Sequence, residues 1–349
     1  MSRLKLRYAV AVIVFITVTA FAAAQRVQLT LDTSEAEAVL ALVQKRQRGD
    51  AITEADWTAL FATEPYRRLK QRELSMKRTF TDEDFRNFVL SNELQQSAPA
   101  LRDTLSRWKT VDLNAAANRV LPYLPDEARI RAKVFPVIKP RSNSFVFDLK
   151  NDPSIFLYVD PARSAAVFEN TVAHELHHIG IASTDEQYQD KIAALAAGPK
   201  LAATYMGAFS EGLAVLAAAG GPEVHPHRFS AAADRERWDR DSANFASDLK
   251  RVEAFFRSLM SGSLAGEAAQ KQAMEFFGEQ GPWYTVGYKM AVMVEKRFGR
   301  ATLIDCMRDP RQLLSYYNQA AQEQDPPGAS LPRWSGDVLT AVGAARPAK

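Results

Sequence analysis

The segment His174-Glu175-Leu176-His177-His178 has the residue types and the spacing of a metal-dependent hydrolytic site. On a helix, His174 and His178 lie one turn apart and project from the same face. Two imidazole nitrogens can then bind one tetrahedral zinc ion at about 2.0–2.1 Å. Glu175 lies about 100° around the helix, beside the metal, where its carboxylate can take a proton from a water molecule. The pattern therefore predicts two metal ligands and a general base.

The sequence around the motif predicts the helix that this geometry needs. Residues 163–181 contain no proline, and their single glycine is Gly180 near the end. Apolar residues recur at intervals of three and four, which is the helical period, so we expect a helix that stops near Gly180. All five histidines of the chain lie between His174 and His227. The alternative is a helix with incidental histidines, because short motifs also occur by chance.

A catalytic zinc site needs a third protein ligand, and Glu211 is the best candidate. It lies in an alanine-rich apolar segment, and its helical neighbours are all small or apolar: Gly207, Ala208, Ala214 and Val215. A buried carboxylate is costly without a partner, and a metal ion is one way to satisfy it. The alternatives are a carboxylate paired with Arg or Lys, or a ligand from another candidate. Those candidates are Asp185, Glu186, His225 and His227.

One common extension of the motif is absent. The pattern H-E-x-x-H-x-x-G-x-x-H requires a glycine at position 181 and a histidine at position 184, where the chain has Ile181 and Thr184. Instead, the motif followed by Glu-Gly-Leu-Ala at 211–214 resembles the gluzincin metallopeptidases, distantly those like aminopeptidase N. The segment 283–288, which opens an apolar helix, resembles the downstream helix in which such enzymes carry a tyrosine.

The resemblance implies roles for six residues. His174, His178 and Glu211 would bind one Zn²⁺ ion per chain, and Glu175 would be the general base. Tyr284 or Tyr288 would donate a hydrogen bond to the oxyanion of the transition state, and ordinary packing is the alternative for both. Aminopeptidase specificity is not implied, because the G-x-M-E-N segment of that group does not occur in the chain.

The N-terminus predicts export. Arg3, Lys5 and Arg7 precede an apolar run over residues 9–21, and three alanines at 22–24 form a cleavage site. This is the pattern of a signal peptide over residues 1–24, so we expect a periplasmic or secreted protein with no stable membrane span after cleavage. The alternative is an uncleaved helix that anchors the protein. Cys306 is the only cysteine, so no disulfide can form within the chain.

Charge and composition indicate the kind of partner. The formal charge is +3, and the predicted signal carries three basic and no acidic residues, which leaves a charge near zero after its removal. No nucleic-acid-binding motif is present, and a neutral chain gives no reason to expect a nucleic acid. We expect a peptide or protein substrate. The sequence gives no indication of the oligomeric state.

The organisation of the chain predicts a mostly α, α+β fold. Residues 26–130 look helical, with helix starts near Thr53 and Thr81. Prolines follow between 122 and 140, and β-rich runs lie at 133–135, 144–147 and 155–159. Helical segments return at 192–219, 235–261, 266–277 and 283–298. We therefore predict a helical region over 25–130 and a zincin-like catalytic domain with a small sheet over 131–349.

Two functions from different classes are compatible with these features. The first is an exported zinc peptidase that uses Glu175 as its general base. The second is a non-catalytic binding or scaffolding protein of the cell envelope that keeps a zincin fold. An intact Glu175 favours the enzyme, because a scaffold has no need of a base beside the metal.

Overall fold

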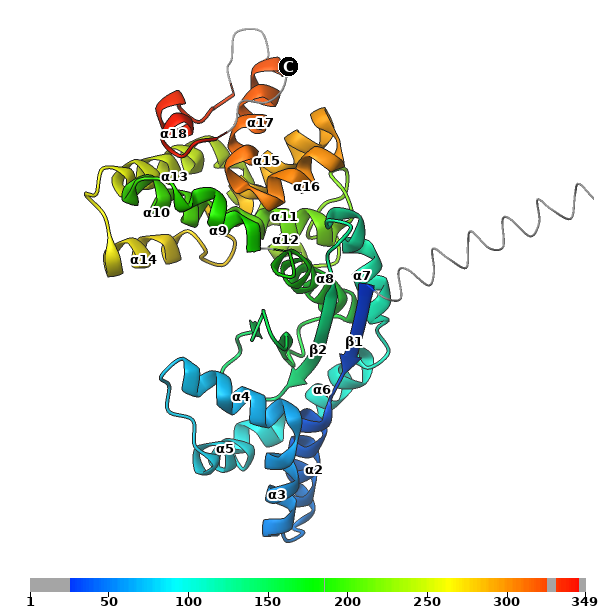
Figure 1. The fold of residues 1–349 in the computed structure, drawn as a ribbon. Helices are drawn as coiled ribbons and strands as arrows, with labels where there is room; N and C mark the ends of the chain where they lie inside the picture. The colour runs from blue at the N-terminus through cyan, green and yellow to red at the C-terminus, as the bar shows by residue number, and fades with distance from the viewer. Residues whose placement is uncertain (1–25, 185, 325–330, 345–349) are drawn as a thin grey trace, which may run out of the picture. The chain divides into compact units, whose positions relative to one another are not determined.

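The computed structural model describes residues 26–184, 186–324 and 331–344 of the chain (Figure 1). The described residues form two compact units, one of those up to Ala117 with Ala128–Val172 and one of Asn118–Glu127 with those from Ala173 onward. Most are helical, and the sheet has four strands, so the predicted mostly α, α+β class is confirmed. The predicted signal peptide at 1–24 lies outside the described residues. The predicted division into 25–130 and 131–349 stays a prediction.

The sheet belongs to the first unit and has the order β1-β2-β4-β3. Its strands are β1 (Val27–Leu31), β2 (Ile130–Val137), β3 (Phe145–Phe147) and β4 (Ser154–Tyr158). β2 pairs in parallel with β1 and β4, and β3 is antiparallel to β4. Strand β1 lies at the start of residues 26–130, which were predicted to look helical, and it was not predicted from the sequence. A five-residue strand gives a weak local signal, and its partner β2 lies about a hundred residues further along the chain.

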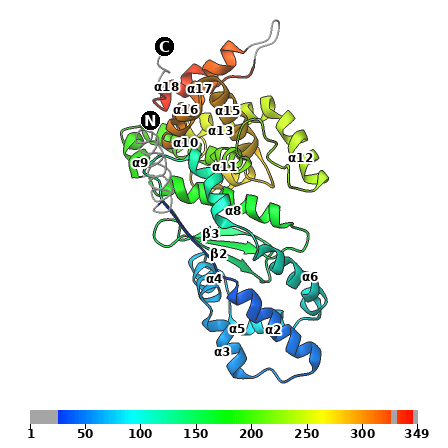
Figure 2. The ribbon, with the colours of Figure 1, turned by 90° about the vertical axis from the view of Figure 1, so that its right-hand side faces the viewer.

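Helices of the first unit begin largely where the capping residues predict. They are α2 (Ser34–Arg48), α3 (Glu54–Ala62), α4 (Glu64–Ser75), α5 (Asp82–Val89) and α6 (Asn92–Trp108); α7 (Leu113–Val120) crosses into the second unit. Thr53 and Asp56 form a capping box at α3. The Thr81 side chain accepts a hydrogen bond from the backbone of Asp84 at α5. Figure 2 shows α2, α3 and α5 grouped together.

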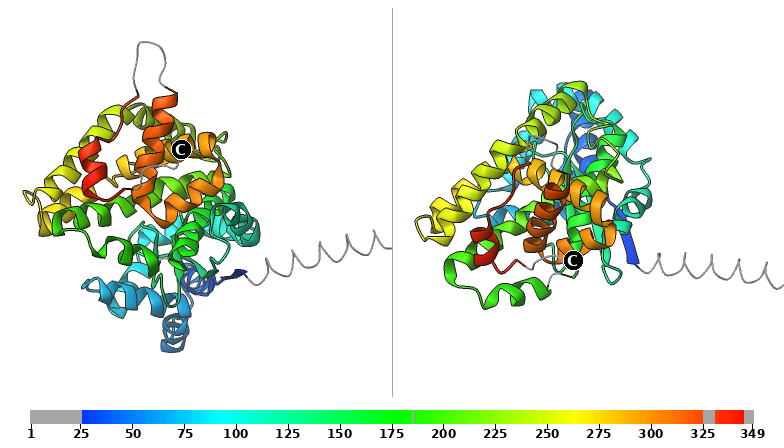
Figure 3. Two further views of the ribbon diagram at one scale, coloured as in Figure 1. Left: turned by 45° about the horizontal axis from the view of Figure 1, so that its top comes forward. Right: turned by 90° about the horizontal axis from the view of Figure 1, so that it is seen from above.

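The helices of the second unit carry the metal motif. They are α8 (Ala165–Ala182, which begins in the first unit), α9 (Glu186–Ala193), α10 (Ala197–Met206), α11 (Ser210–Ala219), α12 (Ala232–Ala243), α13 (Phe245–Met260), α14 (Gly266–Glu275), α15 (Pro282–Phe298), α16 (Arg300–Arg308), α17 (Pro310–Glu323) and α18 (Gly336–Ala341). The motif helix α8 continues two residues beyond Gly180. Figure 3 shows this helical bundle, coloured from green to red, from two further directions.

Two long helices predicted from the sequence are interrupted. Residues 192–219 form α9, α10, a 3₁₀ turn at Gly207–Phe209 and α11. Pro199 lies in the first turn of α10, where its missing N–H costs nothing, so it favours a new start rather than continuation. Residues 235–261 break at Asn244 between α12 and α13. By length and composition Ala197–Ala219 could cross a membrane, but 56% of its apolar window is buried within the protein, as in a core helix.

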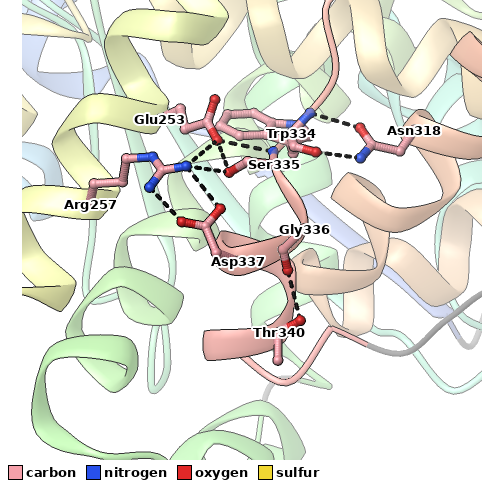
Figure 4. Close-up of polar contacts among 8 residues, drawn as sticks. All are labelled: Glu253, Arg257, Asn318, Trp334, Ser335, Gly336, Asp337 and Thr340. Carbon is pink, nitrogen blue, oxygen red and sulfur yellow. Dashed lines mark hydrogen bonds and ion pairs between the residues drawn. The ribbon is translucent and has the colours of Figure 1, made fainter.

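The C-terminal segment is fastened to the second unit by polar contacts (Figure 4). The Arg257 guanidinium on α13 donates to the Ser335 hydroxyl at 2.8 Å and pairs with Asp337. Asn318 on α17 exchanges two hydrogen bonds with the backbone of Trp334 at 2.7 and 2.9 Å. These contacts hold the Trp334 ring, which is 2% exposed, against the aromatic core beside α15.

Candidate metal centre

The two outer histidines of the motif lie on one face of α8, as the spacing predicts. Their Nε2 atoms are 3.1 Å apart, and each side chain is less than one-fifth exposed. His177, between them in the sequence, points into the core and is 1% exposed. Burial lowers the pKa of His177 well below its usual value, so this ring is neutral. Helix α8 therefore presents His174 and His178 on a partly exposed face and buries His177 in the core.

Glu211 brings the third ligand atom from a different helix. It lies in the first turn of α11, and its Oε2 is 3.1 Å from Nε2 of His174 and 3.3 Å from Nε2 of His178. The side chain is 19% exposed. Burial opposes ionisation of Glu211, but the two imidazoles outweigh it and hold its pKa well below the usual range. The carboxylate is thus an anion enclosed by the two histidines.

The three atoms fit a zinc ion by their mutual distances. In a tetrahedral site with bonds of about 2.05 Å, neighbouring ligand atoms are about 3.3 Å apart. The separations here are 3.1, 3.1 and 3.3 Å, so one point lies at bonding distance from all three. Two nitrogens and one carboxylate oxygen are also a normal donor set for catalytic zinc. Among the described residues, these three form the group of His, Cys, Asp and Glu side chains that could hold a metal ion.

Glu175 lies beside this group. It is partly buried on α8, one residue after His174. Its negative charge contributes to raising the pKa of both His178 and Tyr284, so it acts on a candidate ligand and on the phenol. Glu175 is therefore a carboxylate near the candidate metal site that is not itself one of the three ligands.

The structure separates the two candidate tyrosines. Tyr284, in the first turn of α15, has its ring centroid 6.3 Å from that of His174. Burial and then the charge and hydrogen bond of Glu211 raise the pKa of Tyr284, so its hydroxyl is a neutral donor at the site. Tyr288 packs edge-on against Trp238 at 5.3 Å, and burial with the charge of Glu223 raises its pKa to about 12. Of the two, the structure brings Tyr284 to the ligands.

The other sequence candidates are engaged elsewhere or not described. His225 Nε2 is 3.0 Å from Oδ1 of Asp239, and the His227 ring bonds Ser230 and Gln280 at 3.0 and 2.8 Å. Neither histidine joins the ligand group. Asp185 and Glu186 were the other predicted alternatives for the third ligand. Residue Asp185 and the side chain of Glu186 lie outside the described part of the chain.

A close helix crossing sets the position of Glu211. Helices α11 and α15 cross where Gly212 faces Gly287, the residue after the ligand and the one before Tyr288. A Cβ atom on Gly212 would lie 2.0 Å from the backbone nitrogen of Tyr288, and one on Gly287 would lie 2.8 Å from the carbonyl oxygen of Phe209. Only glycine permits this approach. The sequence shows that small residues surround Glu211. It does not show that Gly212 and Gly287 lie in contact.

Comparison with known proteins identifies a family for most of the chain. The family model described as "Putative zinc dependent peptidase (DUF5700)" matches residues 57–325, which is more than half of the 349-residue chain and includes every residue of the candidate centre. A search of curated proteins and a search of solved structures found no match.

Proposed function

Because the chain belongs to the DUF5700 family, we propose that it is a peptidase that hydrolyses peptide bonds at the centre formed by His174, His178 and Glu211. The observation that carries the proposal is that one ligand atom from each of these three residues lies within 4.8 Å of the others. The carboxylate of Glu175, which is not one of the three, follows His174 on the same helix. The three ligands would hold one zinc ion per chain. Bound zinc would polarise the scissile carbonyl and lower the pKa of a water molecule to about 7.

Glu175 is the general base in this proposal. Its carboxylate accepts the proton of the attacking water and then passes that proton to the leaving amine. Its place next to the ligands, on the same rigid helix as two of them, supports the role, because proton transfer needs a fixed short path. Such a group contributes about 10²–10⁴-fold to the rate.

Tyr284 stabilises the transition state in this proposal. Its ring lies beside that of His174, and burial together with the nearby charge of Glu211 raises its pKa, which keeps the proton on the phenol oxygen. A neutral donor that is already held at the site can turn to the oxyanion that forms when water attacks the carbonyl. The arrangement of a motif helix, a second-helix glutamate and a downstream tyrosine supports a gluzincin type of site.

We also propose that the protein acts outside the cytoplasm on peptide or protein substrates. The basic residues, apolar run and alanines of the first 24 residues support export. Fractionation of cells that produce the natural chain tests this: the protein is expected in the periplasm or medium, shortened by about that length. Recovery of the full-length chain in the membrane would support an uncleaved anchor instead.

The central test compares three purified proteins: wild type, Glu175→Gln and Glu211→Gln. Zinc content is measured first, and cleavage of a peptide library follows with and without a chelator. We expect about one zinc per chain in wild type and in Glu175→Gln, with cleavage only in wild type and only without chelator. Glu211→Gln is expected to lose most of its zinc.

Each other outcome contradicts a stated part of the proposal. Zinc in Glu211→Gln at the wild-type level would remove Glu211 from the ligand set. Cleavage by Glu175→Gln at the wild-type rate would remove the general base. Stoichiometric zinc in wild type with no cleavage across the library would favour a zincin-fold binding protein of the cell envelope.

A further inference from the structure

A second concave site lies in the first unit, separate from every residue of the metal centre. It is a cavity of about 250 Å³ lined by residues of α4 and α5, by residues between them and by residues that follow β2. Leu69, Phe80 and Phe85 form its apolar wall, and Lys139 also lines it. Leu69 and Phe85 are each 1% exposed, so this wall is part of the packed core and does not depend on side chains from the surface.

Lys139 is a buried cation with incomplete pairing. It is 4% exposed, and its Nζ donates to the backbone oxygen of Arg141 and, at 2.9 Å, to Oδ1 of Asn143. An ammonium group has three donors, and within the described part of the chain no carboxylate lies within 4.0 Å of it. Burial lowers the pKa of Lys139 to about 8. Buried charges in proteins are normally paired, so this site favours an anion.

Two carboxylates act on the charge of Lys139, Glu73 and Glu35, and a third, Asp84, lines the cavity at an exposed position. Glu73, on the cavity wall, pairs with Arg72 at 2.5 Å and with Arg78 at 3.6 Å. Glu35 is fully buried, and burial raises its pKa to about 8, so it is largely uncharged at neutral pH. The charge of Lys139 therefore remains available to a ligand.

We propose that this cavity binds a small carboxylate with an apolar body. The carboxylate pairs with Lys139, and the body packs against Leu69, Phe80 and Phe85. At about 30 Å³ for each water-sized group, the cavity of about 250 Å³ has room for roughly eight non-hydrogen atoms. That size selects a short fatty acid or an aryl acid rather than a lipid or a folded partner. Nothing in this inference depends on the peptidase proposal.

The test is a calorimetric titration of the full chain with phenylacetate, hexanoate and phenylacetamide. EDTA is present throughout, so that a carboxylate cannot bind through a metal at the other site. We expect one saturable site for at least one acid and at least tenfold weaker binding of the neutral amide. The two acids separate an aromatic from an aliphatic ligand. Lys139→Met is expected to weaken binding of the acid at least tenfold.

Arg131→Met is the matched control. Arg131 is an exposed cation on β2 that does not line the cavity, so its replacement removes the same charge and is expected to leave the affinity unchanged. Equal affinity for acid and amide, an unchanged affinity in Lys139→Met, or no saturable binding of either acid would each overturn the proposal.

A measurement on the wild type keeps the test decisive if Lys139→Met does not fold. Nuclear Overhauser contacts between the bound acid and the methyl groups of Leu69 are expected, because that side chain lines the cavity. Contacts to methyl groups of the second unit in place of Leu69 would overturn the assignment. Binding that persists when zinc and cleavage are both absent would separate this site from the peptidase.

Discussion

Replacement of Gly212 by alanine is expected to damage the proposed metal centre without changing any of its proposed ligands. The new Cβ would lie 2.0 Å from the Tyr288 backbone nitrogen and 2.3 Å from the Gly287 carbonyl carbon, where ordinary contact begins near 3.4 Å. The shortfall is 3.4 − 2.0 = 1.4 Å. Both opposing atoms belong to the backbone in the middle of the 17-residue helix α15, so they cannot move aside as a side chain can.

The helices must therefore separate by about 1.4 Å, and α11 carries Glu211 with it. Metal sites tolerate deviations of about 0.2 Å in ligand distance. We expect zinc affinity to fall by about 100-fold or more, since lesser disturbances around metal ligands cost about 10–100-fold. The free energy of unfolding should fall by about 1–3 kcal/mol, the usual cost of overpacking a core.

Two other glycine-to-alanine variants provide a control and a smaller clash for comparison. Gly207→Ala has no atom within 4 Å of the new Cβ and serves as the control, whereas Gly287→Ala has its nearest contact at 2.8 Å and should be intermediate. Zinc affinity is measured by competition with a chromophoric chelator, and stability by thermal unfolding without metal. If Gly212→Ala bound zinc as tightly as Gly207→Ala and unfolded at the same temperature, the crossing would not position the ligand.

Three further predictions concern other parts of the molecule. Tyr284→Phe should lower kcat by about 10²–10³-fold and Tyr288→Phe should leave it near wild type; equal losses in a peptide-cleavage assay would contradict the assignment. Burial raises the pKa of Glu35 from 4.5 to about 8, so the native state holds a proton that the unfolded chain releases. The contribution of protonated Glu35 to the free energy of unfolding is fully present below about pH 4.5 and is lost as the pH rises through 8. Glu35→Gln should therefore gain stability relative to wild type between pH 5 and pH 9 in denaturant titrations, and a constant difference would refute this. Trp334→Ala should lower the free energy of unfolding by about 3–5 kcal/mol, because the ring is buried against Phe209 and Phe256; a loss below about 1 kcal/mol would show that the C-terminal segment is not part of the core.

Local periodicity was sufficient for much of the fold and for part of the site. The motif histidines project together because helical geometry fixes their spacing, and Glu211 was found because small and apolar neighbours indicate a buried helix face. The runs that became β2, β3 and β4 were visible as apolar segments between turn residues. Strand β1 was missed because its pairing with β2 joins residues far apart in the sequence, and a strand of five residues carries little signal of its own.

What the sequence left open was decided by contacts between helices. Tyr284 and Tyr288 lie one turn apart on α15, so helical periodicity places them on nearly the same face and cannot separate them. The crossing of α11 and α15 does, because backbone contact at Gly212 and Gly287 fixes which turn of α15 lies beside Glu211. The turn with Tyr284 reaches the ligands, and the next turn packs on Trp238. A crossing that close requires glycine on both helices. A pair of glycines beside a candidate ligand and a candidate tyrosine is therefore the signal by which such a site could be recognised in a single sequence.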